Sequence, residues 1–386
     1  MTRRLLAPLA IASLALGGCA TISDGLDAIN PFSSSAPKMP ALQPFQATAD
    51  VRSAWSVNVG KAADYSFTPA VVDGVVYAAG NKGTISRIED GKVVWKIDAG
   101  QPLSAGVGAN SKLIVVGTPK GEVLAFAPAD GKPLWKAKVS SEVLAAPVVG
   151  EDGVAVKSGD NQVFLFDAAD GGKKWAYQRA TPPLSVRSAG APVFADRYLF
   201  VGYPGGKLVA LALQNGAPVW EGAVASPKGA TELDRVADVV AAPVVDGRQI
   251  CAVAFQGRVA CFDMGQGGAM VWSRDISSVS GLVMDGRYLF ITDDKGVVYG
   301  LDRLSGSSLW KQDKLKGRRL SAPTIRRGLV VVADGEGVIH FLSREDGSFA
   351  ARQKTDGTPV RAPLQMLGSA ALVQTTGGEV SAFEVQ

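Results

Sequence analysis

GEVLAFAPADGKPLW, residues 121–135, contains the pattern that decides the fold of this chain. It runs from a glycine through an alternating apolar strand to an Asp-Gly turn, a short polar stretch and a tryptophan. Three further stretches repeat it clearly: NQVFLFDAADGGKKW (161–175), GKLVALALQNGAPVW (206–220) and GVVYGLDRLSGSSLW (296–310). All seven tryptophans occupy this place in the unit. A repeat of roughly 40 residues with several strands per unit predicts a β-propeller.

A second motif alternates with the tryptophan motif and allows the blades to be counted. It consists of a small residue and proline, a β-branched run, a polar turn and another apolar run, as in TPAVVDGVVYAAG (68–80). The other copies are AAPVVGEDGVAVKSG (145–159), GAPVFADRYLFVGY (190–203), AAPVVDGRQICAVAF (241–255), SAPTIRRGLVVVADG (321–335), RAPLQMLGSAALVQTTGG (361–378) and, without proline, SAGVGANSKLIVVGT (104–118) and SGLVMDGRYLFITDD (280–294). Each copy supplies two hairpin strands, so with the two strands around the Asp-Gly turn the sequence predicts an all-β, eight-bladed propeller of four-stranded blades.

The ends of the chain predict how the ring closes. The eighth unit stops at GGEVSAFEVQ (377–386) with three strands, and the missing tryptophan strand stands at the start of the repeats, as RSAWSVNV (52–59). The N-terminal strand is therefore expected to pair into the last blade and to remove the open edges. The predicted propeller covers residues 51–386. Its seventh unit has Phe349-Ala350-Ala351 in place of a tryptophan, so we expect a less filled blade interface there.

The search for catalytic chemistry finds no candidate. The chain has one histidine, His340, on an apolar strand, where a structural role is expected. A single histidine excludes His-cluster metal sites and most Ser-His-Asp arrangements. No phosphate-binding glycine motif stands between a strand and a helix. With 40 Lys and Arg against 36 Asp and Glu, the charge is too balanced for a nucleic-acid binder. The sequence predicts no catalytic residues, no metal and no cofactor.

The N-terminus carries a targeting signal. Arg3 and Arg4 precede an apolar run that is too short for a stable membrane span, and Leu16-Gly17-Gly18-Cys19 resembles a bacterial lipobox. This resemblance implies a signal peptide over residues 1–18 and acylation of Cys19. The alternative is an ordinary signal peptide that contains a cysteine. Residue 20 is alanine and not the aspartate of inner-membrane retention, so an outer-membrane anchor facing the periplasm is expected.

Residues 19–50 are predicted to form a lipidated, flexible tether. They are rich in proline and serine, as in Asn30-Pro31 and Ser33-Ser34-Ser35, and they lack strand alternation. Such a composition buries too little apolar surface to order itself.

The remaining two cysteines, Cys251 and Cys261, flank the Gln256-Gly257 turn and lie nearly opposite each other on adjacent strands. A disulfide is compatible with an oxidising compartment. Directly paired strands are a strained setting for such a bond, and two buried thiols remain an equal alternative.

The D-x-x-[TSN]-G-x-x-x-W ending of the units resembles the pyrroloquinoline-quinone (PQQ) repeat. Two families share that ring, the quinoprotein dehydrogenases and the BamB outer-membrane assembly factors. Quinoproteins typically carry an adjacent Cys-Cys disulfide and calcium ligands, and this chain has no adjacent cysteine pair. With its lipobox, tether and eight repeats, the chain is similar to the BamB family. The resemblance implies a non-enzymatic scaffold in the β-barrel assembly (BAM) complex. The alternatives are a quinoprotein-like enzyme using the central channel, or another periplasmic interaction module.

Two loop motifs sharpen the resemblance. The family's Leu-Ser-Leu-Arg, before the fourth blade, stands here as Leu184-Ser185-Val186-Arg187. Its Asp-Val-Asp-x-x-Pro, before the fifth, stands as Asp238-Val239-Val240-Ala241-Ala242-Pro243, so the second acidic position is lost. The resemblance implies that Leu184, Val186, Arg187 and Asp238 contact the POTRA domains of BamA.

The propeller topology is compatible with this assignment. Both loops join a fourth strand to the next first strand, so they should emerge on one face of adjacent blades. The alternative is that Arg187 and Asp238 only pair with each other. The other expected partners are further BAM subunits and unfolded outer-membrane proteins, the latter guided by β-augmentation on exposed edge strands or by the opposite face.

Overall fold

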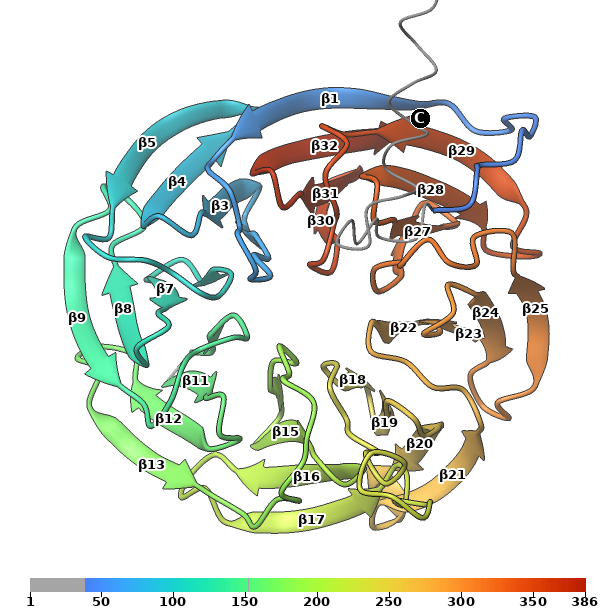
Figure 1. The fold of residues 1–386 in the computed structure, drawn as a ribbon. Helices are drawn as coiled ribbons and strands as arrows, with labels where there is room; N and C mark the ends of the chain where they lie inside the picture. Colours follow the sequence, from blue (N-terminus) through green and yellow to red (C-terminus); the bar gives the residue numbers. More distant parts are fainter. Residues whose placement is uncertain (1–38, 152) are drawn as a thin grey trace, which may run out of the picture. The chain divides into compact units, whose positions relative to one another are not determined.

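The computed structural model describes residues 39–151 and 153–386. Eight four-stranded antiparallel sheets stand around a common axis, as Figure 1 shows. Within blades 1 to 7 the four strands follow one another both in sequence and in space. The prediction of an all-β, eight-bladed propeller is therefore confirmed.

The first four blades have the following strands. Blade 1 comprises β2 (Ala70–Val72), β3 (Val75–Ala79), β4 (Thr84–Glu89) and β5 (Lys92–Asp98). Blade 2 comprises β6 (Gly108–Ala109), β7 (Ile114–Gly117), β8 (Glu122–Phe126) and β9 (Pro133–Lys138). Blade 3 comprises β10 (Val148–Val149), β11 (Gly153–Lys157), β12 (Val163–Asp167) and β13 (Lys173–Tyr177). Blade 4 comprises β14 (Val193–Ala195), β15 (Tyr198–Tyr203), β16 (Lys207–Ala212) and β17 (Pro218–Ala223).

The other four blades complete the ring. Blade 5 comprises β18 (Val244–Asp246), β19 (Gln249–Val253), β20 (Val259–Asp263) and β21 (Ala269–Arg274), with the 3₁₀ turn η1 (Met264–Gln266) before β21. Blade 6 comprises β22 (Gly281–Asp285), β23 (Tyr288–Thr292), β24 (Val298–Asp302) and β25 (Ser308–Gln312). Blade 7 comprises β26 (Thr324–Arg326), β27 (Leu329–Ala333), β28 (Val338–Ser343) and β29 (Phe349–Lys354). Blade 8 comprises β30 (Gln365–Leu367), β31 (Ala370–Gln374), β32 (Glu379–Val385) and β1 (Val51–Asn58).

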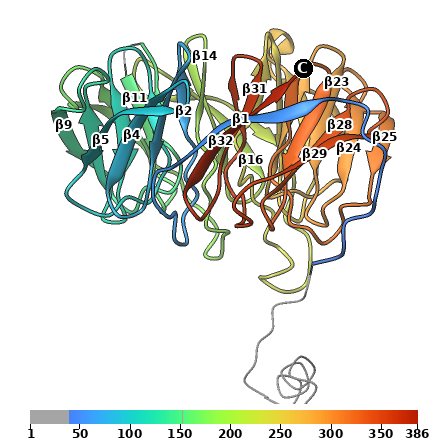
Figure 2. The same cartoon turned by 90° about the horizontal axis from the view of Figure 1, so that it is seen from above.

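The antiparallel order gives the disc two different faces. One face carries the loops that lead from a fourth strand to the next blade, together with the turns between second and third strands; we call it the loop face. The other carries the turns between first and second and between third and fourth strands, and we call it the hairpin face. In Figure 2 the loop face points down, and the loop over residues 224–243 extends from it.

The ring closes through the N-terminal strand, as the sequence predicts. β1 pairs antiparallel with β32 from Val51↔Val385 to Asn58↔Glu379, and Figure 1 shows the two strands side by side. A register shift next to Trp55 places this tryptophan opposite Ala382, as the tryptophans of other blades lie opposite their third strands. The first strand of the domain thus completes its last blade.

In the seven blades that have a tryptophan, this residue packs on the turn between the third and fourth strands of the next blade. Trp135 shows the arrangement. A Cβ atom on Gly171 would lie 2.6 Å from Trp135 Cε3, and Gly171 has φ +73°, which favours glycine. The indole N–H donates to the Ala168 carbonyl at 2.9 Å. Equivalent hydrogen bonds join Trp95 to Pro128, Trp175 to Leu213, Trp272 to Arg303 and Trp310 to Arg344.

Two tryptophans pack on a turn glycine without this hydrogen bond, within the described part of the chain. Trp55 faces the two-residue turn at Gly91, which is too short to offer the carbonyl three residues before the glycine. Trp220 faces Gly268, where η1 lengthens the turn. The ring packing is therefore the constant part of the contact, and the hydrogen bond depends on turn length.

Blade 7 has Ala351 at the tryptophan position, opposite Phe341. The expected poor filling is not observed, because Phe341, Phe383 and Val385 pack together with Ala351 in one buried cluster. Blade 8 also has no turn between its third and fourth strands, since these are β32 and β1, which are not consecutive in the sequence. A tryptophan here would have no glycine to pack on.

Residues 40–50, predicted to belong to the flexible tether, lie along β29 and form part of the domain; we call them the strap. The rings of Phe45 and Phe349 are 5.4 Å apart, and the Arg352 guanidinium lies 4.8 Å from the Phe45 centroid. The N–H groups of Thr48 and Ala49 donate to the Ala350 carbonyl at 2.9 and 3.1 Å. The prediction of a flexible tether therefore concerns only the residues before Met39. These residues, together with Cys19 and the lipobox, lie outside the described residues.

A buried polar network holds the start of the strap. Arg318 is 1% exposed and donates to Asp334 and Glu336, at 2.6 Å each, and to the Pro40 carbonyl. His340 Nε2 lies 2.9 Å from the Asp334 carboxylate. Burial lowers the pKa of His340, so the imidazole is neutral at pH 7. The histidine has the structural environment expected for it.

The tryptophan–glycine contact can be tested with a matched pair of substitutions. Gly171 and Gly328 have nearly the same φ (+73° and +75°), but a Cβ atom meets Trp135 at the first and nothing within 4 Å at the second. Both alanine variants suffer left-handed backbone strain of about 1–2 kcal/mol. Only Gly171→Ala adds overpacking, about 1–3 kcal/mol more. Urea unfolding should show the larger loss for Gly171→Ala, and equal losses would contradict the packing role.

Candidate functional site: paired loops on the loop face

The two loops with family motifs leave adjacent blades on the loop face. The loop over residues 178–192 joins β13 to β14, and the loop over residues 224–243 joins β17 to β18. The second is the longest connection between tryptophan units, and Figure 2 shows it, in yellow, below the disc. The structure therefore brings together the two segments that the sequence singled out.

Asp238 fastens the two loops to each other from inside the protein. Its side chain is buried, with the residue 1% exposed, and its carboxylate accepts the Val186 N–H at 2.7 Å and the Gly205 N–H at 3.0 Å. Ser188 Oγ adds a bond to the Val240 carbonyl at 2.9 Å. A carboxylate in this position holds residues 184–188 in place. The partner contact predicted for Asp238 stays a prediction, and in this structure its side chain is buried beneath the loops.

Arg187 does not pair with Asp238. Its guanidinium donates to both carboxylate oxygens of Glu142, at 2.8 and 2.6 Å, and lies 5.6 Å from the ring centroid of Tyr65. The hydrogen bonds from Arg187 hold the pKa of Glu142 below its usual range. The Arg187 side chain stays 54% exposed. Loops from three blades therefore orient one accessible cation.

Sequence reasoning missed Glu142 and Tyr65. Glu142 lies in the loop that leads into blade 3, and Tyr65 in the loop that leads into blade 1. Their place in the repeat could have indicated them, because both residues lie in the same type of loop as Arg187, between a fourth strand and the next first strand. Nothing in the local sequence indicates which of the eight such loops approach one another across the disc.

Apolar side chains surround the cation. Leu184 is 40% exposed, Val186 is partly buried, and Pro182 and Pro183 are exposed beside them. On the second loop Leu233 is 69% exposed. Apolar anchors next to an oriented arginine are the composition of a protein-binding hot spot. The arrangement can bind a protein surface, and it brings together no nucleophile and general base.

A cavity of about 780 Å³ opens on the loop face, where the leading segments of several blades meet. Val186 and Arg187 form part of its wall, and much of the remainder is alanine, serine and glycine. Its acidic lining consists of Asp293 and Asp294. The described residues contain no group of three or more His, Cys, Asp or Glu side chains placed to hold a metal ion. They also contain no helix long and apolar enough to cross a membrane.

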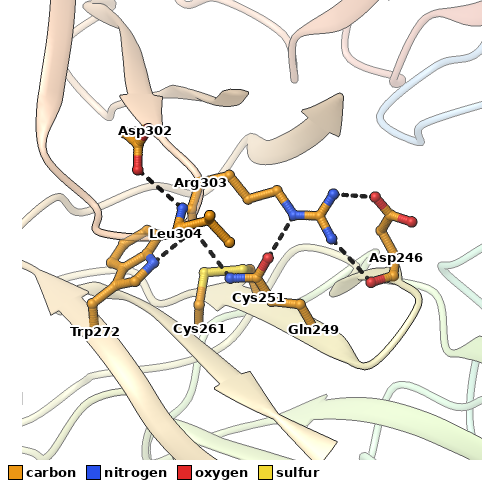
Figure 3. The surroundings of a disulfide bond; sticks show 8 residues. All are labelled: Asp246, Gln249, Cys251, Cys261, Trp272, Asp302, Arg303 and Leu304. Carbon is orange, nitrogen blue, oxygen red and sulfur yellow. Dashed lines mark hydrogen bonds and ion pairs between the residues drawn. A yellow bond between two sulfur atoms is a disulfide. The ribbon is translucent and has the colours of Figure 1, made fainter. Parts of the chain in front are cut away.

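Cys251 and Cys261 are joined by a disulfide, shown in Figure 3. They are direct partners on β19 and β20, with Cα atoms 4.1 Å apart, and both are fully buried. Cys261 also lies opposite Trp272 on β21. The structure thus contains the bonded alternative of the two that the sequence left open.

The surroundings of the disulfide are a joint between blades 5 and 6. The Arg303 carbonyl accepts from Trp272 Nε1 at 2.8 Å and from Gln249 Nε2 at 3.0 Å. The Arg303 guanidinium returns to blade 5, where it donates to Gln249 and pairs with Asp246 (Figure 3). These side chains and the Arg303 carbonyl bond to one another, and the disulfide lies beside this contact between blades 5 and 6.

Comparison with known proteins agrees with this geometry. A family model described as "Outer membrane protein assembly factor BamB" matches residues 81–312, more than half of the chain. The chain is 41% identical to the outer membrane protein assembly factor BamB of Bordetella pertussis over 371 residues, which are 95% of this chain and 93% of that protein. The crystal structure of BamB from Moraxella catarrhalis superposes with a TM-score of 0.81 at 26% identity, covering 87% of this chain and 100% of that one.

A quinohemoprotein alcohol dehydrogenase from Comamonas testosteroni also superposes, with a TM-score of 0.70, over 87% of this chain and 76% of that one. At 14% identity this shows a common fold only. The fold is an eight-bladed propeller whose paired loops place exposed apolar side chains beside an oriented arginine. The chain belongs to the BamB family of outer membrane protein assembly factors. It is a non-enzymatic assembly factor, and the quinoprotein alternative is not favoured.

Proposed function

We propose that this chain is a scaffold subunit of the BAM complex and that its loop face docks on a POTRA domain of BamA. The observation that carries the proposal is the pair of loops fastened by Asp238, which presents Leu184, Val186 and Arg187 on one surface. Other BAM subunits are further partners. A small number of accessible side chains suits an interface with a few dominant contacts.

In this proposal the binding residues have two different tasks. Leu184, Val186 and Arg187 touch the partner. Asp238 positions them from below, and Glu142 orients the Arg187 guanidinium from the side. The motif position occupied by Val240 has no acidic group, and Glu142 supplies the carboxylate that pairs with the arginine. Oriented side chains lower the ordering cost of association.

The proposal places the domain at the outer membrane, on the periplasmic side, through a lipid on Cys19. Two features support it. The lipobox precedes a proline- and serine-rich segment, and the strap begins at the loop face, where Pro40 lies against Gly317. Figure 2 shows the strap, in blue, descending along the rim of the disc to that face.

Unfolded outer-membrane proteins are the proposed substrates of the outer strands. Five exposed apolar residues occupy the bulged position just before the tryptophan: Val94, Leu134, Val219, Val271 and Leu309. In blade 7 the same position is Ala350, which is 2% exposed because the strap covers it and bonds to its carbonyl. The strap thus shows that an outer strand of this propeller can be covered by another segment, here through two N–H groups that share one carbonyl and without a β-ladder.

Charge reversal at Arg187 tests the docking surface. Arg187→Glu places a carboxylate beside Glu142 and replaces the cation that the partner would meet, so co-purification with BamA in mild detergent should be lost. The melting temperature should change little, because exposed ion pairs contribute about 0–1 kcal/mol. Arg248→Glu is the matched control, since Arg248 is exposed on the hairpin face. Unaltered co-purification of Arg187→Glu would refute this surface.

Substitution of the acylated residue tests the anchor. Cys19→Ser leaves no thiol for acylation, so the protein should move from the outer-membrane fraction to the soluble periplasmic fraction. Metabolic labelling with a fatty acid should be lost at the same time. Labelling that persists in Cys19→Ser would contradict the assignment.

Lysines on the outer strands test substrate binding. The triple variant Val94→Lys, Val219→Lys, Val271→Lys should weaken photo-crosslinking to an unfolded outer-membrane protein several-fold, because edge lysines oppose strand addition. Threonine at the same positions keeps strand propensity without charge and serves as the control. Equal crosslinking by the lysine and threonine variants would exclude the outer strands as the binding site.

A further inference from the structure

The buried carboxylate of Asp238 poses an electrostatic question. It accepts two backbone N–H groups, from Val186 and Gly205, and the residue is 1% exposed. A buried charge is costly unless an opposite charge compensates it. Arg187, the cation that the motifs place nearby, is bound to Glu142 instead.

Lys157 is the cation on the inner side of the same loops. It ends β11, is 5% exposed, and donates from Nζ to the Gly202 carbonyl at 2.8 Å. Its Nζ lies 5.6 Å from the ring centroid of Tyr203, a face that attracts cations. The negative charge of Asp238 acts on this ammonium group.

Lys157 and Asp238 hold the same short turn from two sides. The segment over residues 202–205, which is the end of β15 and the start of its turn to β16, bonds to both side chains. Lys157 binds the carbonyl of Gly202, and the Asp238 carboxylate binds the N–H of Gly205. The backbone continues the connection, since the Val239 N–H donates to the Tyr203 carbonyl at 3.2 Å. Lys157 is therefore connected to the docking loops through one short backbone segment.

We infer that Lys157 is a positioning residue for the docking loops: its buried positive charge compensates the Asp238 carboxylate, which in turn fixes the Val186 N–H and the residues around it. The consequence for partner binding rests on the proposed function. The consequence for loop order does not, because Asp238 and Val186 are bonded in the chain alone.

The charge compensation between Lys157 and Asp238 should depend on pH, in a range where few other groups of this region titrate. Burial lowers the pKa of Lys157 to about 8, against the opposing effect of the Asp238 charge. The other titratable groups around the Tyr203 ring are Tyr177 and Arg179. Burial raises the pKa of Tyr203 far above this range. Raising the pH from 7 to 9 therefore removes the proton from Lys157 and leaves the Asp238 charge uncompensated.

Hydrogen exchange of the full-length lipoprotein in detergent tests the inference without a partner. After correction for the intrinsic pH dependence, the peptide over residues 183–190 should exchange about tenfold faster or more at pH 7 in Lys157→Met than in the wild type, because a buried carboxylate then has no compensating charge nearby. The wild type should approach the variant at pH 9. Lys112→Met, an exposed lysine on the hairpin face, is the matched control. Unchanged exchange in folded Lys157→Met would overturn the inference.

A double substitution separates charge from packing. In the Asp238→Asn background no carboxylate needs compensation, so adding Lys157→Met should change the exchange of residues 183–190 much less than it does in the wild type. An equal effect in both backgrounds would show that Lys157 acts only by filling space, and this result would also overturn the inference.

A third experiment measures the affinity of the wild type and of Lys157→Met for the periplasmic part of BamA. Wild-type affinity should fall between pH 7 and 9, whereas Lys157→Met should bind more weakly at pH 7 and show no further fall. A pH profile that is the same in both proteins would count against Lys157. If the wild type does not bind BamA while its loop exchange behaves as expected, the proposed function fails and the positioning role stands.

Discussion

The contact between a tryptophan and the turn glycine of the following blade is the interaction on which the rest of this structure depends. A four-stranded blade is apolar on both faces, so it can bury its surface only against neighbours. The indole ring fills the wide outer part of the gap between two blades, and the turn must carry a glycine because no Cβ fits there. The contact is directional, from one blade to the next. Repeated around the ring, it fixes how far each blade turns relative to its neighbour.

A directional contact creates a problem where the ring closes, and the chain resolves it at blades 7 and 8. Blade 8 is completed by β1, so it has no turn to receive a tryptophan, and blade 7 has Ala351 instead. The strap then covers the outer strand of blade 7, with Phe45 on Phe349 and Pro40 held by Arg318. The segment that leads towards the proposed anchor is therefore attached before the closing strand begins. A force on the N-terminus would act first on the strap and its buried arginine, and only afterwards on the pairing of β1 with β32.

The sequence predicted the fold well because a repeat carries the same information many times. Eight copies of the hairpin motif and seven tryptophans tolerate local exceptions, and the position of Trp55 together with the three-strand eighth unit indicated the closure. Residues 40–50 have no repeat and no strand alternation, so their packing on blade 7 was not predictable from local pattern. At the candidate site, too, some features were predictable from sequence and others were not. Motifs identified the loops, but burial of Asp238 and the pairing of Arg187 with Glu142 depend on how loops from different blades approach one another. Only the three-dimensional arrangement contains that information.

The docking surface combines exposed apolar side chains with polar groups buried beneath them. Leu184 and Arg187 are accessible, while Asp238 and Lys157 are almost completely covered. Replacing such a buried pair with apolar residues often stabilises a protein, so its presence is poorly explained by stability alone. A loop without regular structure, however, loses conformational freedom when a partner binds it. The Asp238 carboxylate holds the Val186 N–H in the chain alone. Under the proposed function, part of this loss of conformational freedom therefore occurs during folding, before a partner binds. Under the proposed function, the two buried charges contribute to association by fixing the geometry of the loops, and the partner meets Leu184, Val186 and Arg187 instead.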